Sequence, residues 1–225
     1  MFAVFLVFLS IWPVDSVLPK TKKPSLIPKC LEGYSLFQRV PSDRNSLTKF
    51  WCLGVFNATH DIRNREWARS TCSYFNGSLS IPQNEKEADF LSDQVNKDVS
   101  VEFGFAMDGE ITPRCKALHY HFKTDFNKPG ECNVESGLFA FQDRHTDPTF
   151  IRKHFPRVPS ASRALSFESS PMFKEIAACA VLTQKWNLTK VTYADVVYCS
   201  VPEDKEHLRM IYSAVCGTLP MWVKL

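Results

Sequence analysis

The clearest periodic pattern of apolar and polar positions lies at residues 64–77 and predicts a helix. Asp61 or Asn64 can cap the start of this helix, and Gly77 can adopt the left-handed conformation that ends it. The segment also places Cys72 on the helix. Large side chains recur at intervals of three or four positions and share one helical face: Trp67, Thr71, Tyr74 and Phe75.

A second helix is predicted at residues 84–95. Asn84 is followed three positions later by Glu87, which resembles a capping box at the start of a helix. The apolar stripe that follows consists of Ala88, Leu91 and Val95. Between the two helices, Leu79 and Ile81 alternate with serines, as in a short strand.

After residue 100 the apolar positions alternate with small or polar ones, which predicts strands. At residues 101–107 the pattern is typical of a strand with one buried face, made by Val101, Phe103, Phe105 and Met107. Further strands are predicted at 137–143, 175–182, 186–191 and 212–216. Residues 144–174 read as an irregular loop, and so long a loop inside a domain is usually functional or disordered. Two helices followed by strands and a long loop predict an α+β fold.

The N-terminal residues 1–16 form an apolar run that is too short to span a bilayer and is typical of a signal peptide. Residues 17–29 carry lysines among prolines and predict an extended basic linker. We expect one domain at 30–218 and a short tail at 219–225. No later segment is apolar for long enough to span a membrane. The formal net charge of +3 gives no reason to expect a nucleic-acid partner.

The eight cysteines are the strongest indication of where the protein folds and what stabilises it. An even number of cysteines behind an export signal points to an oxidising compartment and to disulfides, although the sequence alone leaves the pairing open. One alternative is a zinc site made by Cys115, His119 and His121, but a disulfide at Cys115 is favoured. A nucleophilic cysteine would need a free thiolate, and eight paired cysteines leave none.

Three sequons fit the secretory route and predict N-glycosylation at Asn57, Asn76 and Asn187. If Asn187 carries a glycan, its side chain faces solvent. On an alternating strand the preceding Trp186 then faces inward, as a core residue rather than a platform for a sugar.

Five segments, taken in order, resemble the C-type lectin-like domain: CLEGYSLF, REWARSTC, GSLSIPQNEKEADFL, CAVL with the later W and YC, and SAVCG. Two further segments, FGFAMDGEITPRC and GLFAFQDRHTDPTF, resemble the form of this domain common in secreted nematode lectin-like proteins. The resemblance covers about residues 30–218. It implies an α+β lectin-like fold in which disulfides staple two helices, small antiparallel sheets and a long irregular loop.

The resemblance also implies how the cysteines pair. The expected bridges are Cys72–Cys216, Cys179–Cys199, Cys30–Cys52 and, between the two cysteines that remain and lie near each other, Cys115–Cys132.

Calcium-dependent members of this family hold one Ca²⁺ through a Glu-Pro-Asn or Gln-Pro-Asp tripeptide and an Asn-Asp pair before a cysteine. The best match to the tripeptide is Val158-Pro159-Ser160, in which valine offers no ligand. Before Cys199 only Asp195 could ligate. One carboxylate falls well short of the roughly six to eight oxygens that Ca²⁺ takes. We therefore expect no cofactor, and calcium-dependent sugar binding is disfavoured.

The sequence thus predicts a secreted, non-catalytic recognition module for a glycan or a protein surface. Aromatics and bases on an anchored loop suit recognition, so the expected ligand-binding residues are Arg152, Lys153, Phe155, Arg157 and Arg163. The competing interpretation is that the aromatics of this loop, Phe150 and Phe155, pack onto the domain while its bases are solvated.

Two alternative functions remain open at this stage. One is a host-defence or protein-interaction effector that binds no sugar. The more remote one is a secreted metal-dependent hydrolase with Asp143, His145 and Asp147 as candidate ligands, although this segment reads better as a polar loop that leaves a strand.

Overall fold

The structure, a computed structural model, describes part of the 225-residue chain. The predicted signal peptide, residues 1–16, lies outside that part. No helix in the described part is both long enough and apolar enough to cross a membrane. The described residues are 25–59, 62, 65–95, 105–115, 132–133, 137–154, 178–182, 194–198 and 213–224.

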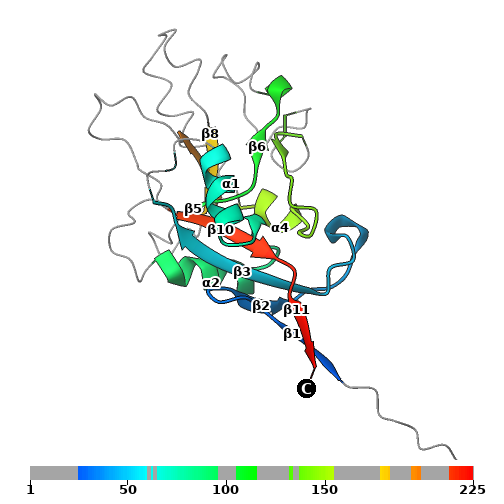
Figure 1. Cartoon of the computed structure of the whole chain (residues 1–225). Helices are drawn as coiled ribbons and strands as arrows, with labels where there is room; N and C mark the ends of the chain where they lie inside the picture. Colours follow the sequence, from blue (N-terminus) through cyan, green and yellow to red (C-terminus); the bar gives the residue numbers. More distant parts are fainter. Residues whose placement is uncertain are drawn as a thin grey trace, which may run out of the picture.

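A mixed sheet forms the centre of the fold (Figure 1). Its strands are β2 (Ser35–Gln38), β3 (Phe50–Asn57), β4 (Ser78–Leu79), β5 (Phe105–Ala106), β8 (Ala178–Leu182), β9 (Ala194–Tyr198) and β10 (Ser213–Thr218). Along the sheet they follow the order β2, β3, β10, β5, β8 and β9, and β4 also pairs with β10. All these pairs are antiparallel except β10 with β5, which is parallel.

The helices α1 (Arg65–Tyr74) and α2 (Glu85–Val95) pack into two separate cores, one on each side of this sheet. Alternate residues of β10 point into the two cores. Val215 belongs to the core that contains α2, whereas Cys216 belongs to the core that contains α1. This combination of helices and mostly antiparallel strands confirms the predicted α+β class.

Both predicted helices are present, but α1 turns a different face to the sheet than its large side chains suggest. Its buried residues are Ala68 and Cys72. Trp67 and Tyr74 are instead 41% and 81% exposed. Small side chains allow close packing of the helix on the sheet, so the large side chains lie on the outer side.

The predicted strands are shorter than the alternating pattern suggests. Phe105–Ala106 form a strand in the described part of the first segment, residues 105–107, and of 137–143 only Phe139–Ala140 do so. Phe105 and Ala106 are both buried, because β5 lies inside the sheet with a core on each side. The expectation of a single buried face was therefore wrong for this strand. The strand predicted at 186–191 lies outside the described residues.

Several short elements lie outside the central sheet. The strands β6 (Glu110–Ile111) and β7 (Phe139–Ala140) form a separate two-stranded antiparallel sheet. A 3-10 helix, η1, spans Asp43–Asn45. The helix α4 (Thr149–Arg152) lies in the segment predicted as an irregular loop.

The two ends of the described chain pair with each other. β1 (Leu26–Lys29) and β11 (Met221–Lys224) form an antiparallel two-stranded ribbon, which projects from the body of the molecule in Figure 1. Residues 17–29 and 219–225 were predicted as linker and tail, but each contributes a strand. Pairing between distant segments is not visible in local sequence patterns.

Three disulfides join described cysteines, and they are pairs that the family resemblance implies: Cys30–Cys52, Cys72–Cys216 and Cys115–Cys132. Because Cys115 is bonded to another cysteine, the zinc alternative loses its sulfur ligand. His119 and His121 lie outside the described residues. So does Cys199, the partner implied for Cys179.

A buried ion pair joins β2, α2 and the segment that follows β7. Nε and Nη2 of Arg39 donate to both carboxylate oxygens of Glu87, at 2.8 and 2.7 Å, and both side chains are fully buried. Nη1 of Arg39 donates to Thr146 Oγ1 at 2.8 Å. Half of the predicted capping box is present, since the Asn84 side chain accepts from the Glu87 amide. Glu87 itself accepts from the amide of Gln83, because Arg39 draws its carboxylate away from the expected position.

We expect Glu87→Gln to lower the free energy of unfolding by about 3 kcal/mol or more, because it removes the carboxylate that is paired with the buried Arg39 cation. Glu85→Gln, on the exposed side of the same helix, is the matched control and should change it by less than about 0.5 kcal/mol. Urea denaturation without reductant measures both. Equal stabilities of the two variants would contradict a structural role for the ion pair.

Candidate functional site

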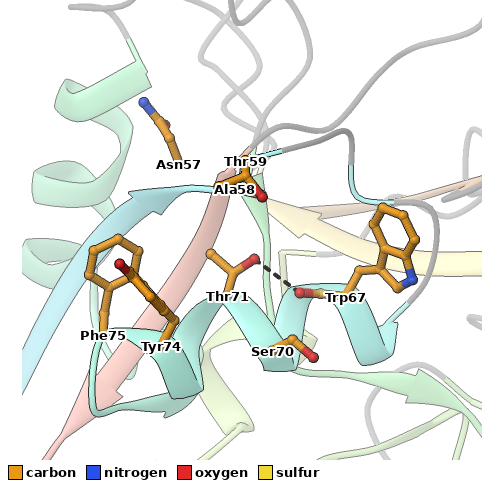
Figure 2. A pocket seen from close by; sticks show the side chains of 8 residues that line it. All are labelled: Asn57, Ala58, Thr59, Trp67, Ser70, Thr71, Tyr74 and Phe75. Atoms are coloured by element: carbon orange, nitrogen blue, oxygen red, sulfur yellow. Dashed lines mark hydrogen bonds between the residues drawn. The ribbon is translucent and has the colours of Figure 1, made fainter.

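An open cleft lies along the outer side of α1, beside the end of β3 (Figure 2). Its volume is about 400 Å³, within the range of small-molecule sites. The described part of the lining combines aromatic rings with hydroxyl and amide groups, and none of its described residues is charged. The lining residues are Asn57, Ala58, Thr59, Trp67, Ser70, Thr71, Tyr74 and Phe75.

A series of aromatic contacts leads from the core to this cleft. The rings of Tyr34 and Phe56 lie 4.7 Å apart, and Phe56 stacks on Phe75 at 4.3 Å. Phe75 in turn meets Tyr74 edge to face at 5.1 Å. Tyr34 and Phe56 are buried, whereas Tyr74 at the outer end is 81% exposed. The exposed ring is therefore supported by a rigid aromatic base.

The turn after α1 is fixed by close contacts beneath the cleft. Tyr34 Oη donates a hydrogen bond to the carbonyl of Phe75 at 3.1 Å. Gly77 must lack a side chain, since a Cβ there would lie 2.2 Å from that Oη. The left-handed residue is Asn76, with φ of 57°, rather than Gly77 as the sequence suggested. Asparagine tolerates this conformation better than most residues.

The opposite wall of the cleft comes from the end of β3. Asn57 is the last residue of that strand and is paired with Ser213 of β10. The hydroxyl of Ser213 donates to Asn57 Oδ1 at 2.6 Å. Across the cleft, Thr71 Oγ1 donates to the carbonyl of Trp67 at 3.0 Å and retains its lone pairs as acceptors. Both polar groups therefore have defined orientations.

Some residues in the described part of the predicted ligand-binding loop pack onto the domain, whereas Lys153 is exposed. Ile151 of α4 is fully buried, and Phe150 packs against the core. The guanidinium of Arg152 lies 5.1 Å from the centre of the Phe141 ring, and its Nη2 donates to a backbone carbonyl. Burial lowers the pKa of Arg152. Lys153 follows α4 directly.

The remaining residues predicted to bind ligand, Phe155, Arg157 and Arg163, lie outside the described residues. The tripeptide Val158-Pro159-Ser160 does so too, and so do Trp186 and Asn187. Asp195 falls in strand β9.

The polar segment after β7 is hydrogen-bonded within itself, to Ser80 and to the start of α4. Asp143 accepts hydrogen bonds from Ser80, from Thr146 at 2.6 Å and from the His145 amide at 2.8 Å. Burial raises the pKa of Asp143. His145 stacks on Trp51 at 4.9 Å, and Asp147 accepts from the amide and hydroxyl of Thr149 at the start of α4.

These contacts support the interpretation of Asp143, His145 and Asp147 as a structural polar loop. Over the described part of the chain, no three His, Cys, Asp or Glu side chains are grouped so that they could hold a metal ion.

The sequence interpretation missed the cleft because it used the large residues of α1 only as the signal of a helix. Trp67, Tyr74 and Phe75 do share a side of the helix, as predicted, but that side borders the cleft. A second periodicity was available in Ala68 and Cys72, four positions apart. The expected bridge from Cys72 to the last strand of the domain indicates that the small residues form the inner face.

The fold and its disulfides define a C-type lectin-like protein, as the sequence resemblance predicted. The chain belongs to the C-type lectin domain-containing protein 141/158 family, whose sequence model matches residues 36–219.

One relative is C-type lectin domain-containing protein 158 of Caenorhabditis elegans. It is 26% identical over 203 residues, which cover 86% of this chain and 90% of the relative. Among solved structures, the SPL-1–GlcNAc complex aligns with a TM-score of 0.40 and 10% identity, over 84% of this chain and 94% of that chain. A likeness this slight carries no argument about ligand or site.

Tyr34, under the cleft, gives a test of this geometry. Burial raises the pKa of Tyr34 to about 12, from 10.0. The stability that its protonated hydroxyl contributes is therefore complete below pH 10 and is lost as the pH rises toward 12. Spectrophotometric titration of the tyrosines should show a component near 12 that is missing in Tyr34→Phe. If Tyr34→Phe leaves the titration curve of the folded protein unchanged in shape, the burial of the Tyr34 hydroxyl under the cleft is contradicted.

Proposed function

We propose that this protein is an extracellular, non-catalytic recognition module that binds a neutral sugar in the α1 cleft without calcium. The observation that carries the proposal is the joint presence of exposed aromatic rings, hydroxyl groups and an amide in one cleft whose described lining residues are all uncharged. Disulfide formation in an oxidising compartment agrees with an extracellular location.

The cleft has the chemistry that a sugar ring needs. A pyranose has C–H groups on its faces, which pack on aromatic rings, and hydroxyls around its edge, which need hydrogen-bond partners. Tyr74 and Trp67 supply exposed rings. They are two helical turns apart, so they would contact different rings of an oligosaccharide. Between them Ser70 and Thr71 supply hydroxyls, and Asn57 supplies an amide on the other wall.

The lining residues that the structure describes carry no charge, and this affects which ligand fits the cleft. A sulfated or carboxylated sugar would lose water in the cleft without gaining a counter-charge, which costs free energy. A stable protein partner usually covers about 800 Å² on each side, far more than the mouth of a cleft of this size. A neutral oligosaccharide therefore fits better than an anionic glycan or a folded protein.

The lining also supports a role in binding rather than catalysis. None of the eight described lining residues is Asp, Glu, His, Cys or Lys, the residue types that most often exchange protons in catalysis. The calcium independence rests on the sequence, in which Val158-Pro159-Ser160 replaces the ligating tripeptide of calcium-dependent lectins.

We test this proposal with a glycan array probed with protein made without N-linked glycans, in calcium and in EDTA. We expect binding to neutral oligosaccharides that EDTA does not change. Tyr74→Ala should weaken it about tenfold, because the exposed ring contributes stacking and buried area worth about 1.4 kcal/mol. Val40→Ala removes an apolar side chain with the same 81% exposure outside the cleft and should leave binding unchanged.

Three results would contradict the proposal. Loss of binding in EDTA would place the sugar at a calcium site. Equal binding by Tyr74→Ala and the parent protein would place it outside the α1 cleft. Absence of binding to every glycan would favour the effector that recognises a protein and no sugar.

A further inference from the structure

The wall of the α1 cleft contains a site for N-glycosylation. Asn57, Ala58 and Thr59 form an Asn-x-Thr sequon, and all three residues line the cleft. The side chain of Asn57 is exposed at the end of β3. An oligosaccharide on Asn57 therefore starts inside the border of the cleft and not on a distant surface.

In Figure 2 the side-chain nitrogen of Asn57 points away from α1, so an oligosaccharide on it reaches the cleft by turning back toward the helix. The hydrogen bond from Ser213 engages Oδ1 of the side chain, and the oligosaccharide is attached through Nδ2. This bond fixes the plane of the amide and with it the direction in which the first sugar leaves. Figure 2 places Asn57 at the end of the cleft where Tyr74 and Phe75 lie, with Trp67 at the other end.

The modification itself is a group transfer from an activated oligosaccharide. Nδ2 of Asn57 forms a bond to the anomeric carbon of the sugar and loses one proton. The bond between that carbon and the pyrophosphate of a lipid-linked donor breaks, and the pyrophosphate leaves with the bonding electrons.

We propose that the N-linked oligosaccharide on Asn57 turns back along α1 and occupies the cleft in cis, so that only molecules with unmodified Asn57 bind a free sugar there. This inference rests on the proposed function, because the same aromatic surface must bind a sugar in both cases. The occupant is the first, GlcNAc-containing part of the chain's own glycan.

Because the glycan is attached to Asn57, it can occupy the cleft even if its contacts with the lining are weak. A group on a short linker has an effective concentration in the millimolar range and needs no separate association step. If the cleft binds a free sugar with a Kd of about 0.1 mM, its attached copy weakens that binding about tenfold. The exposed rings of Tyr74 and Trp67 are then covered in the glycosylated protein.

A second sequon provides an internal comparison. Asn76 lies in the turn after α1, is exposed, and does not line the cleft. Its sequon ends at Ser78, which is exposed on β4. Ser78→Ala therefore removes the Asn76 glycan and keeps the glycan on Asn57, whereas Thr59→Ala does the reverse.

The test measures the affinity for N,N′-diacetylchitobiose, the two-sugar stem of N-linked glycans. Each protein is measured twice, once secreted with its glycans and once made without them. Mass spectrometry first establishes occupancy of Asn57. Titration calorimetry then gives the ratio of the two Kd values for each protein. We expect a ratio of about ten for the parent protein and for Ser78→Ala, and about one for Thr59→Ala. Because each variant is compared with its own unglycosylated form, any direct effect of residue 59 on the cleft cancels.

A second measurement does not depend on added sugar. Tyr74→Ala should lower the Tm of the glycosylated protein by about 3 °C. This shift is expected for a chain of this length when the affinity of the cleft for the attached glycan falls tenfold. It should leave the Tm of the unglycosylated protein unchanged, since the ring is then largely in solvent.

The outcomes separate this inference from the proposed function. Two outcomes overturn cis occupancy and leave recognition of free sugar standing. The first is that Asn57 carries no glycan. The second is that the parent protein binds chitobiose with the same Kd with and without its glycans. Absence of chitobiose binding in every form, together with a Tm effect of Tyr74→Ala only in the glycosylated protein, supports cis occupancy and removes free-sugar recognition. Absence of both effects overturns both.

Discussion

The disulfide between Cys72 and Cys216 decides which side of α1 faces the sheet. Both cysteines are fully buried, and the bond joins positions 144 residues apart in sequence. Ala68, one turn earlier, extends the same narrow inner face. With this side of the helix fixed, Trp67 and Tyr74 lie on the opposite side, next to the end of β3. The α1 cleft is thus a consequence of the crosslink and of the small residues that accompany it.

The two sides of the central sheet then differ in their chemistry. On the α2 side, charged groups are consumed in buried contacts: Arg39 with Glu87 and Thr146, and Asp143 with hydroxyls and an amide. These contacts hold the segment after β7 and the start of α4 against the domain. On the α1 side, the described residues of the cleft lining are aromatic or uncharged polar and small, and the cleft is open to solvent. The first arrangement suits stability, and the second suits recognition.

The sequence predicted the two helices, the α+β class and the family, because local periodicity and the order of short motifs carry that information. It did not predict the pairing of β1 with β11, since strands at opposite ends of a chain leave no local signal. It assigned recognition to the long loop, whereas Phe150 and Arg152 of that loop are engaged with the core. The α1 cleft escaped notice because aromatic periodicity marks a buried face in most helices, and only the crosslinked cysteine reveals the inner one.

The central claim is that the outer side of α1 is the surface that binds sugar. Heteronuclear NMR of the unglycosylated protein, titrated with N,N′-diacetylchitobiose, tests it most directly. The account predicts that chemical-shift changes concentrate on residues 57–59 and 67–75. Changes confined to the segment that begins at α4 and to β9, with the α1 signals unmoved, would contradict it.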